Sequence, residues 1–233
     1  PEPTGARLPL AETRDLIVME DIVAKDPLPT QNYAAMNGYA VRSEDTKGAT
    51  KEFPVEGKMV ERLSAGQVRK RPLGKNEVVR VVAGSLLPTN ADAVVLSEDA
   101  DRVGKSIKIY RTATAGENVR MRGEDIEKGE MILKKGRRIR SQEIAMLAAL
   151  GIHEVPVYPR PKTAILTTGR ELASLGKSRG EGQVWNCLSP MLRAMVEETG
   201  GQAFDLGHVT ERSWSLKGKI REGLNYPIFI LAG

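Results

Sequence analysis

The chain has 233 residues, of which 40% are hydrophobic and 28% are charged, and its formal net charge is +5. A chain of this length and composition can bury a core and form one or two globular domains. It has no run of the roughly 18 to 20 apolar residues that span a bilayer, and its first residues do not resemble a secretory signal, so we expect a cytoplasmic protein with no membrane partner. The single cysteine, Cys187, excludes an internal disulfide.

The excess of basic residues does not by itself indicate nucleic-acid binding. The 35 Lys and Arg residues are interspersed with 30 Asp and Glu, and the densest basic cluster, residues 134–140, is typical of a solvated turn between strands. Three Phe and two Trp are too few to supply a platform for base stacking. Small phosphorylated ligands fit the charge balance equally well, so we do not expect nucleic acid as a partner.

The first part of the chain predicts a helix followed by a loop and a β-rich region. Residues 10–24 carry apolar side chains at helical spacing, and Pro27 and Pro29 end this segment. Asn37 and Gly38 then favour positive φ and predict a turn before a strand at residues 39–41. Short β-type runs separated by Gly, Pro and Asn follow and predict a small β domain. These runs are residues 52–60, 77–82, 93–96 and 106–110.

The second part predicts an α/β domain. Ser141 is the expected N-cap of a helix that ends at Gly151, and a strand at residues 155–158 follows. The stiff segment at residues 159–161, Pro-Arg-Pro, marks a domain boundary. Beyond it, strand and helix patterns alternate, which is typical of a parallel sheet. The expected strands are residues 163–166, 203–206 and 227–231, and the expected helix is residues 190–200.

A first candidate binding site follows the strand at residues 163–166. Open α/β sheets bind ligands outside the carboxyl ends of their strands, where Thr167, Thr168, Gly169 and Glu171 lie. Backbone N–H groups and the two hydroxyls could hold an anion there. The spacing lacks the full glycine pattern of a dinucleotide fingerprint or a P-loop, and a tight turn with a capping threonine is the structural alternative.

A second candidate site lies in the segment GENVRMRGEDI, residues 116–126. Arg120 and Arg122 alternate with apolar residues, so both side chains would lie on the same side of a strand. Their guanidinium groups could bind a phosphate or another oxyanion, while the carboxylate of Asp125 could hold a divalent cation. Ion pairing between these arginines and the acidic residues that follow them is the structural alternative.

Four segments stand out together in one order: AAMNGYAV at 34–41, VVRVVAGSLLPTNADAVVLSED at 78–99, GENVRMRGEDIEKGEMIL at 116–133 and QEIAMLAALGIHEVPVYPRPKTAILTTGREL at 142–172. In this order they resemble the molybdopterin molybdenumtransferase family, which includes the MoeA proteins and the gephyrin E domain. The resemblance implies insertion of molybdate into adenylylated molybdopterin with release of AMP, assisted by Mg²⁺, in a homodimer with its active cleft between subunits.

The resemblance also implies a multidomain fold of the α/β plus β class. Residues 1–41 and 122–160 would form an elongated mixed domain that serves as linker and dimer contact. Residues 42–121 would form a β domain inserted into it. Residues 161–233 would form a three-layer α/β domain of the molybdopterin-binding type, incomplete at its C-terminal side.

The family's functional residues can be carried over to matching positions of this sequence. Asp125 matches the acidic residue of the family's GED motif, and Glu171 matches the carboxylate of its TGDEL loop. The resemblance makes both of them catalytic carboxylates and metal ligands. The residues expected to bind the pterin substrate are those of the TTG loop and of the arginine segment: Thr167, Thr168, Gly169, Arg120 and Arg122.

Five polar positions depart from the family's pattern. Asn37 stands at a third catalytic position, where the family's MDGYA motif has Asp, and an amide binds a cation more weakly than a carboxylate. Ala83 lacks the hydroxyl of a family threonine. Arg170 reverses a charge next to Glu171. Near the start of the following helix, Asn186 and Leu188 replace an Asp and an Asn.

These departures leave two hypotheses. In the first, the protein is an active transferase in which Asp125 and Glu171 suffice to place the cation. In the second, it is a degenerate, non-catalytic relative that binds molybdopterin or a protein partner as a scaffold. Magnesium-dependent turnover with release of AMP distinguishes them.

Overall fold

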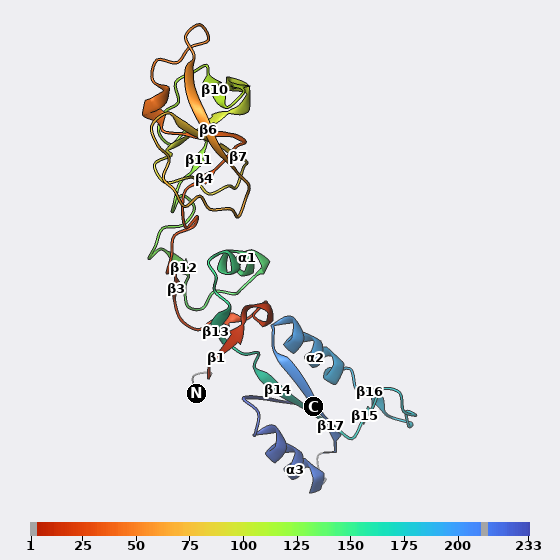
Figure 1. The fold of residues 1–233 in the computed structure, drawn as a ribbon. Coiled ribbons are helices and arrows are strands. Elements are labelled where there is room, and N and C mark those ends of the chain that lie inside the picture. Colours follow the sequence, from red (N-terminus) through yellow and green to blue (C-terminus); the bar gives the residue numbers. More distant parts are fainter. Residues whose placement is uncertain (1–3, 211–213) are drawn as a thin grey trace. The chain divides into compact units, whose positions relative to one another are not determined.

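The computed structural model describes residues 4–210 and 214–233. The chain forms two compact units. The first, called the β unit below, runs from Ile22 to Ile132; it contains the strands labelled β6, β7 and β10 in Figure 1. The second, the split unit, combines the residues up to Asp21 with those from Leu133 onward. The chain therefore leaves one unit, builds the other, and returns.

A six-stranded sheet forms the body of the β unit, in the order β8-β5-β7-β6-β10-β9. Neighbouring strands are antiparallel except β6 and β7, which are parallel. The predicted β-type runs are confirmed, because each overlaps one of these strands, and the strand expected before residue 42 is β5. The bounds are β5 Gly38–Val41, β6 Val55–Leu63, β7 Glu77–Val81, β8 Ala93–Leu96, β9 Ala100–Val103 and β10 Ser106–Ile109.

Both faces of this sheet are buried. Val78 and Val79 are adjacent on β7, yet they pack in two different hydrophobic clusters. Val94 and Val95 on β8 are divided between the two clusters in the same way. Because successive side chains of a strand point to opposite faces, a continuous apolar run can fill both cores. This accounts for the adjacent valines on β7 and β8. A sheet with one exposed face would instead alternate apolar and polar residues along each strand.

The positive-φ turn predicted at Asn37 and Gly38 is wrong. Neither residue has a positive φ, and β5 begins at Gly38. A Cβ atom at Gly38 would lie 2.1 Å from the carbonyl oxygen of Val95 on the neighbouring strand β8. Glycine is therefore required here by the close approach of two backbones, and the turn chemistry of the pair is not used.

Short elements complete the β unit. The strands β3 and β12 pair with each other, so the two ends of the β unit lie side by side, and β4 pairs with β11. Two 3₁₀ turns, η2 and η3, connect longer strands. The bounds are β3 Ile22–Val23, β4 Tyr33–Ala34, η2 Ser43–Thr46, η3 Ser97–Asp99, β11 Val119–Arg120 and β12 Met131–Leu133.

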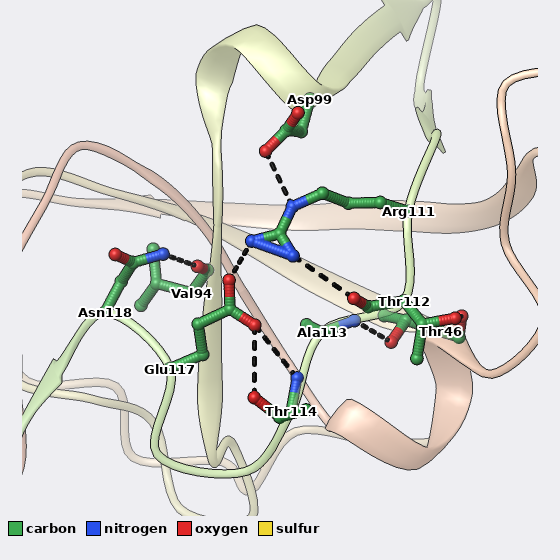
Figure 2. Close-up of polar contacts among 9 residues, drawn as sticks. All are labelled: Thr46, Val94, Asp99, Arg111, Thr112, Ala113, Thr114, Glu117 and Asn118. Carbon is green, nitrogen blue, oxygen red and sulfur yellow. Dashed lines mark hydrogen bonds and ion pairs between the residues drawn. The ribbon is translucent and has the colours of Figure 1, made fainter.

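A polar network fixes the loop between β10 and β11 (Figure 2). The Arg111 guanidinium bonds Asp99 through Nε at 2.8 Å and Glu117 through Nη2. The other carboxylate oxygen of Glu117 accepts the Thr114 N–H at 3.0 Å. At the end of the loop, the Asn118 amide donates to the carbonyl oxygen of Val94 at 2.9 Å. The loop is thus held against β8 immediately before β11 begins.

The N-terminal part of the split unit is a small sheet in the order β1-β13-β2, and the helix predicted at residues 10–24 is wrong. This segment pairs its backbone with residues 137–139: Val18 N–H donates to the oxygen of Arg137, and Ile139 N–H donates to that of Leu16. Long-range pairing replaces helical bonds and buries Val18 completely. The bounds are β1 Ala6–Pro9, η1 Leu10–Glu12, β2 Ile17–Val18 and β13 Glu154–Tyr158.

The C-terminal part of the split unit is the predicted parallel sheet, in the order β17-β14-β18. Helices α2 and α3 lie on opposite sides of these strands (Figure 1). Because β17 and β18 flank β14, right-handed crossovers place the two connecting helices on opposite faces. The bounds are β14 Lys162–Thr168, β15 Leu172–Ala173, β16 Val184–Trp185, α2 Leu188–Glu198, β17 Gln202–Val209, α3 Trp214–Gly223 and β18 Ile228–Ala232. No helix in the described residues is long and apolar enough to cross a membrane.

Helix α1, Ser141–Ala149, begins with a charged cap. Arg140 is the N-cap residue, one position before the predicted Ser141. The Glu143 carboxylate accepts the Arg140 backbone N–H at 2.9 Å and its guanidinium Nη2 at 2.6 Å. The side-chain bond to Arg140 is the main reason that the pKa of Glu143 falls from 4.5 to about 2. At the other end, Gly151 has φ 72° and donates to the oxygen of Ala148, as predicted for a C-terminal glycine.

The Glu143 cap makes the stability of the split unit depend on pH. A carboxylate whose folded pKa is lowered stabilises the fold above its unfolded pKa of 4.5 and loses that contribution as the pH falls toward about 2. We expect Glu143→Gln to lower the free energy of unfolding by about 2 kcal/mol at pH 7 and by much less at pH 3. Urea unfolding followed by circular dichroism at both pH values measures this. An equal loss at both pH values would contradict it, and Glu127→Gln, an exposed carboxylate, is the control.

The Arg111–Glu117 pair gives a second expectation. Both side chains are partly exposed, so the pair itself contributes only about 0.5–1 kcal/mol. A double-mutant cycle with Arg111→Gln and Glu117→Gln, measured by urea unfolding, should give a coupling energy of that size. A coupling of zero would mean that the other bonds of the network, such as Asn118 to Val94, hold the loop without this ion pair.

Candidate functional site

Two distant segments of the β unit are joined through their backbones. Leu28 N–H donates to the oxygen of Ile126 at 2.8 Å, and Asp125 N–H donates back to that of Leu28 at 3.0 Å. The Gly123 N–H donates to the oxygen of Pro29 at 2.9 Å. Prolines keep the first segment extended, which leaves its carbonyl groups free to accept these bonds. The proline loop, residues 27–29, and the GED segment, residues 123–126, are therefore paired through their backbones and are called the joined loops below.

Arg120 lies beside the joined loops, at the end of β11. Its guanidinium forms ion pairs with Asp125 at 2.5 Å and with Glu124 at 3.4 Å. It also lines a hollow of about 290 Å³, together with Pro29, Tyr33, Ala34, Ala35 and Gly84. Arg120 is the only charged side chain among these lining residues. The hollow thus offers one guanidinium to an anion, next to two carboxylates.

Arg122 does not share a strand with Arg120 as the sequence suggested. Strand β11 ends at Arg120, and a turn follows in which Glu124 accepts the Met121 N–H at 2.8 Å. The Arg122 N–H is bonded to the side-chain oxygen of Asn32 at 2.8 Å. The expectation of two arginines on one strand face is therefore wrong, because the strand pairing with β4 stops after two residues.

Asn37 supports the edge of the same hollow. Its side-chain oxygen accepts the backbone N–H of Ala83 at 2.9 Å, next to Gly84, which lines the hollow with φ 81°. A carboxylate could accept the same N–H and would add a negative charge. The amide at position 37 therefore keeps a structural bond that the family's Asp could also make, while it removes the charge.

In the split unit, strand β14 extends through Thr168, so only Gly169 of the predicted TTG loop lies beyond the strand. The expectation that the strand ends before Thr167 is wrong, because both threonines pair with β17. The Gly169 carbonyl oxygen accepts the ring N–H of His208 Nε2 at 2.6 Å. Gly169 has φ 147°, and a Cβ there would lie 2.6 Å from a carboxylate oxygen of Glu171. Glu171 is thus folded back over Gly169, and the positive φ of this position favours glycine.

Thr167 is fully buried, and its hydroxyl is engaged inside the unit. It donates to the Gly207 carbonyl oxygen at 3.2 Å and accepts the Asn186 amide at 2.8 Å. Asn186 is itself buried, so its amide must find such a partner. With Asp in place of Asn186, the direction of this bond would reverse, because a carboxylate can only accept.

Next to this network lies a second hollow, of about 300 Å³, lined by residues of β17, of the first turns of α2 and of the segment after β15. Ser189 Oγ, at the start of α2, donates to Asp205 there at 2.5 Å. The residues that line the hollow include Asn186, Ser189, Arg193, Asp205 and His208. The sequence had pointed to the TTG loop and Asn186, but not to Ser189, Asp205 or His208, which belong to none of the motifs above. The packing of α2 against β17 brings Ser189 and Asp205 together.

The described residues contain no group of three or more His, Cys, Asp or Glu side chains that could hold a metal ion. Asp125 and Glu171, the predicted metal ligands, belong to different units. Mg²⁺ commonly uses only one or two protein carboxylates, with water and substrate phosphates as its remaining ligands. Single carboxylates beside an anion-binding group therefore fit this cation.

Comparison with known proteins identifies the family. Residues 2–151 match the model of the MoeA N-terminal region (domain I and II). The chain is 35% identical over 193 residues to a molybdopterin molybdenumtransferase of Staphylococcus epidermidis, covering 83% of this chain and 46% of that protein. It is 37% identical to molybdopterin molybdenumtransferase 2 of Mycobacterium tuberculosis, with 83% and 48% covered. The chain thus spans about half the length of these curated relatives.

A solved structure agrees with the sequence comparisons. The molybdopterin biosynthesis MoeA protein of Pyrococcus horikoshii superimposes with a TM-score of 0.92 at 35% identity, covering 99% of this chain and 60% of that chain. Its fold has the same mixed sheets and few helices. The family model covers more than half of the sequence, and the structural match extends through the split unit as well. The chain is a member of the MoeA family.

Proposed function

We propose that the protein takes part in molybdenum cofactor biosynthesis as a molybdopterin molybdenumtransferase, which inserts molybdate into adenylylated molybdopterin and releases AMP. The observation that carries this proposal is the Arg120 hollow, where one guanidinium is flanked by Asp125 and Glu124 beside the joined loops. Substrates with phosphate and molybdate groups require such a cationic donor. The names of the relatives favour this enzyme over a non-catalytic scaffold.

Each predicted site residue receives a role in this proposal. Arg120 binds a phosphate or oxyanion group in its hollow, and Arg122 adds positive charge nearby. The TTG loop contacts the pterin substrate through Thr168 and Gly169, while buried Thr167 holds the loop from within. Asn186 orients the Thr167 hydroxyl toward the Gly207 carbonyl oxygen.

Magnesium is the proposed cofactor, and Asp125 and Glu171 are its candidate ligands. A bound Mg²⁺ would neutralise part of the negative charge that develops on phosphate oxygens. The chain's own residues bind and orient the substrate groups. Asn37, the third position of the catalytic set, contributes the bond to Ala83 and no charge.

We further propose the family's domain organisation and a homodimer. Residues 1–41 and 122–160 would form the elongated linker and dimer domain, 42–121 the inserted β domain, and 161–233 the three-layer α/β domain of the molybdopterin-binding type. The parallel order β17-β14-β18 with a helix on each face supports the assignment of the last domain.

Release of AMP tests the proposed function. The protein, expressed with any coding sequence that continues its reading frame, is incubated with adenylylated molybdopterin, molybdate and Mg²⁺, and AMP is measured by chromatography. We expect AMP release that stops when Mg²⁺ is removed by a chelator. The Staphylococcus epidermidis relative serves as the positive control.

An Asn37→Asp variant tests, in the same assay, whether the missing carboxylate at position 37 limits AMP release. A carboxylate at this position keeps the Ala83 bond and attracts the cation more strongly, so we expect AMP release to rise about tenfold, which corresponds to about 1.4 kcal/mol. Asn32→Asp, which changes another side chain that accepts a backbone N–H in the β unit, is the matched control. Silence of both the parent and Asn37→Asp would reject the transferase proposal in favour of a scaffold.

A further inference from the structure

An ion pair joins Arg120 and Asp125, to which the proposed function assigns the binding of ligands of opposite charge. Arg120 is the candidate anion ligand and Asp125 the candidate cation ligand, yet they contact each other at 2.5 Å. Glu124 adds a second negative charge 3.4 Å from the same guanidinium. In this arrangement the positive and negative groups neutralise one another. Neither is fully available to a ligand while the pair persists.

The backbone around the pair is fixed, whereas its side chains are accessible. Asp125 N–H and Gly123 N–H are bonded to the proline loop, and Arg120 lies in the paired strand β11. In contrast, the side chains of Arg120 and Asp125 are 45% and 46% exposed. Exposed ion pairs are weak because water and salt screen them. A competing anion can therefore separate the side chains without disturbing the fold.

The lining of the hollow determines what kind of ligand can replace Asp125 as the ion-pair partner of Arg120. This lining offers a single charged side chain, Arg120, and otherwise Pro29, Tyr33, small residues and backbone. A tetrahedral dianion that enters the hollow meets the same guanidinium that holds Asp125. Two anions that share one cation repel each other, so binding of the dianion weakens the hold on Asp125.

We propose that Arg120 is an exchangeable counter-ion: it neutralises Asp125 until a dianion of the phosphate class enters the hollow, and it then releases the Asp125 carboxylate to bind Mg²⁺. This inference rests on the proposed function for the roles of the two residues. It adds that anion and cation binding are positively coupled. By thermodynamic reciprocity, Mg²⁺ at Asp125 also strengthens anion binding at Arg120.

Sulfate and Mg²⁺, titrated separately into the 233-residue chain, test the exchange without any substrate. Sulfate has the charge and shape of the proposed ligand and binds Mg²⁺ only weakly, and sodium chloride keeps the ionic strength constant. NMR signals of the Arg120 Nε–H group report sulfate binding, and the Asp125 backbone amide reports Mg²⁺ binding.

Removing the carboxylate should free the guanidinium. We expect Asp125→Asn to bind sulfate about two- to fivefold more tightly than the parent, which is the range expected for an exposed ion pair. Glu127→Gln removes the same charge two residues away and should bind sulfate as the parent does. Equal or weaker sulfate binding by Asp125→Asn would overturn the inference, because Asp125 would then be a support for Arg120 and not its competitor.

The reciprocal experiment starts from the cation. Saturating sulfate should raise the Mg²⁺ affinity of the parent about two- to fivefold, and Arg120→Gln should show the raised affinity without sulfate and no further response to it. Absence of a sulfate effect on the parent would also overturn the inference. These titrations involve no turnover, so a failure of the AMP assay and a failure of the exchange are separate results.

Discussion

The backbone bonds between the proline loop and the GED segment are the constraint on which the candidate site of the β unit depends. They join Leu28 and Pro29 to residues nearly a hundred positions later in the sequence. Because the bonds run through main-chain atoms, side chains on both segments stay free for ligands. This explains how exposed residues such as Arg120 and Asp125 can be placed reproducibly on loops. The junction places Asp125 beside Arg120, whereas Arg122 is positioned by its bond to Asn32.

Sequence patterns predicted the repeating structure better than the irregular parts. The β-type runs and the parallel α/β segment were identified because their apolar residues fill cores directly along the strand or helix. The helix predicted at residues 10–24 was wrong, because the spacing of apolar residues there is also compatible with the short strands β2 and β3. The true partners of this segment, residues 137–139, lie far along the chain, and no local pattern reveals such pairing. The turn predicted at Gly38 was wrong for a similar reason. Glycine is required there by the close approach of strand β8 at Val95, which local sequence does not reveal.

The candidate sites show the same division. Motifs pointed to Thr167, Gly169 and Arg120. Arg120 lines a hollow, Gly169 accepts a hydrogen bond from His208, which lines the other hollow, and Thr167 is a buried strand residue bonded to Asn186. Other groups beside them, such as Ser189 and Asp205, belong to no motif and become neighbours only when α2 packs against β17. A residue's chemistry can thus be read locally, whereas its partner depends on topology. Position 186 illustrates both, because Asn and Asp have similar shapes but opposite roles toward Thr167.

The pairing of β1 with β13 has a consequence for how the protein forms during synthesis. Ala6 pairs with Val157, about 150 residues later, so the first strand must wait without its partner while the whole β unit is translated. At typical rates of elongation this interval lasts roughly 10 to 30 seconds, which is ample time for a β unit to fold first. Alternating exposed residues on β1, such as Arg7, leave this waiting strand partly polar. The order of translation therefore lets the β unit fold before the split unit, although the β unit lies in the middle of the sequence.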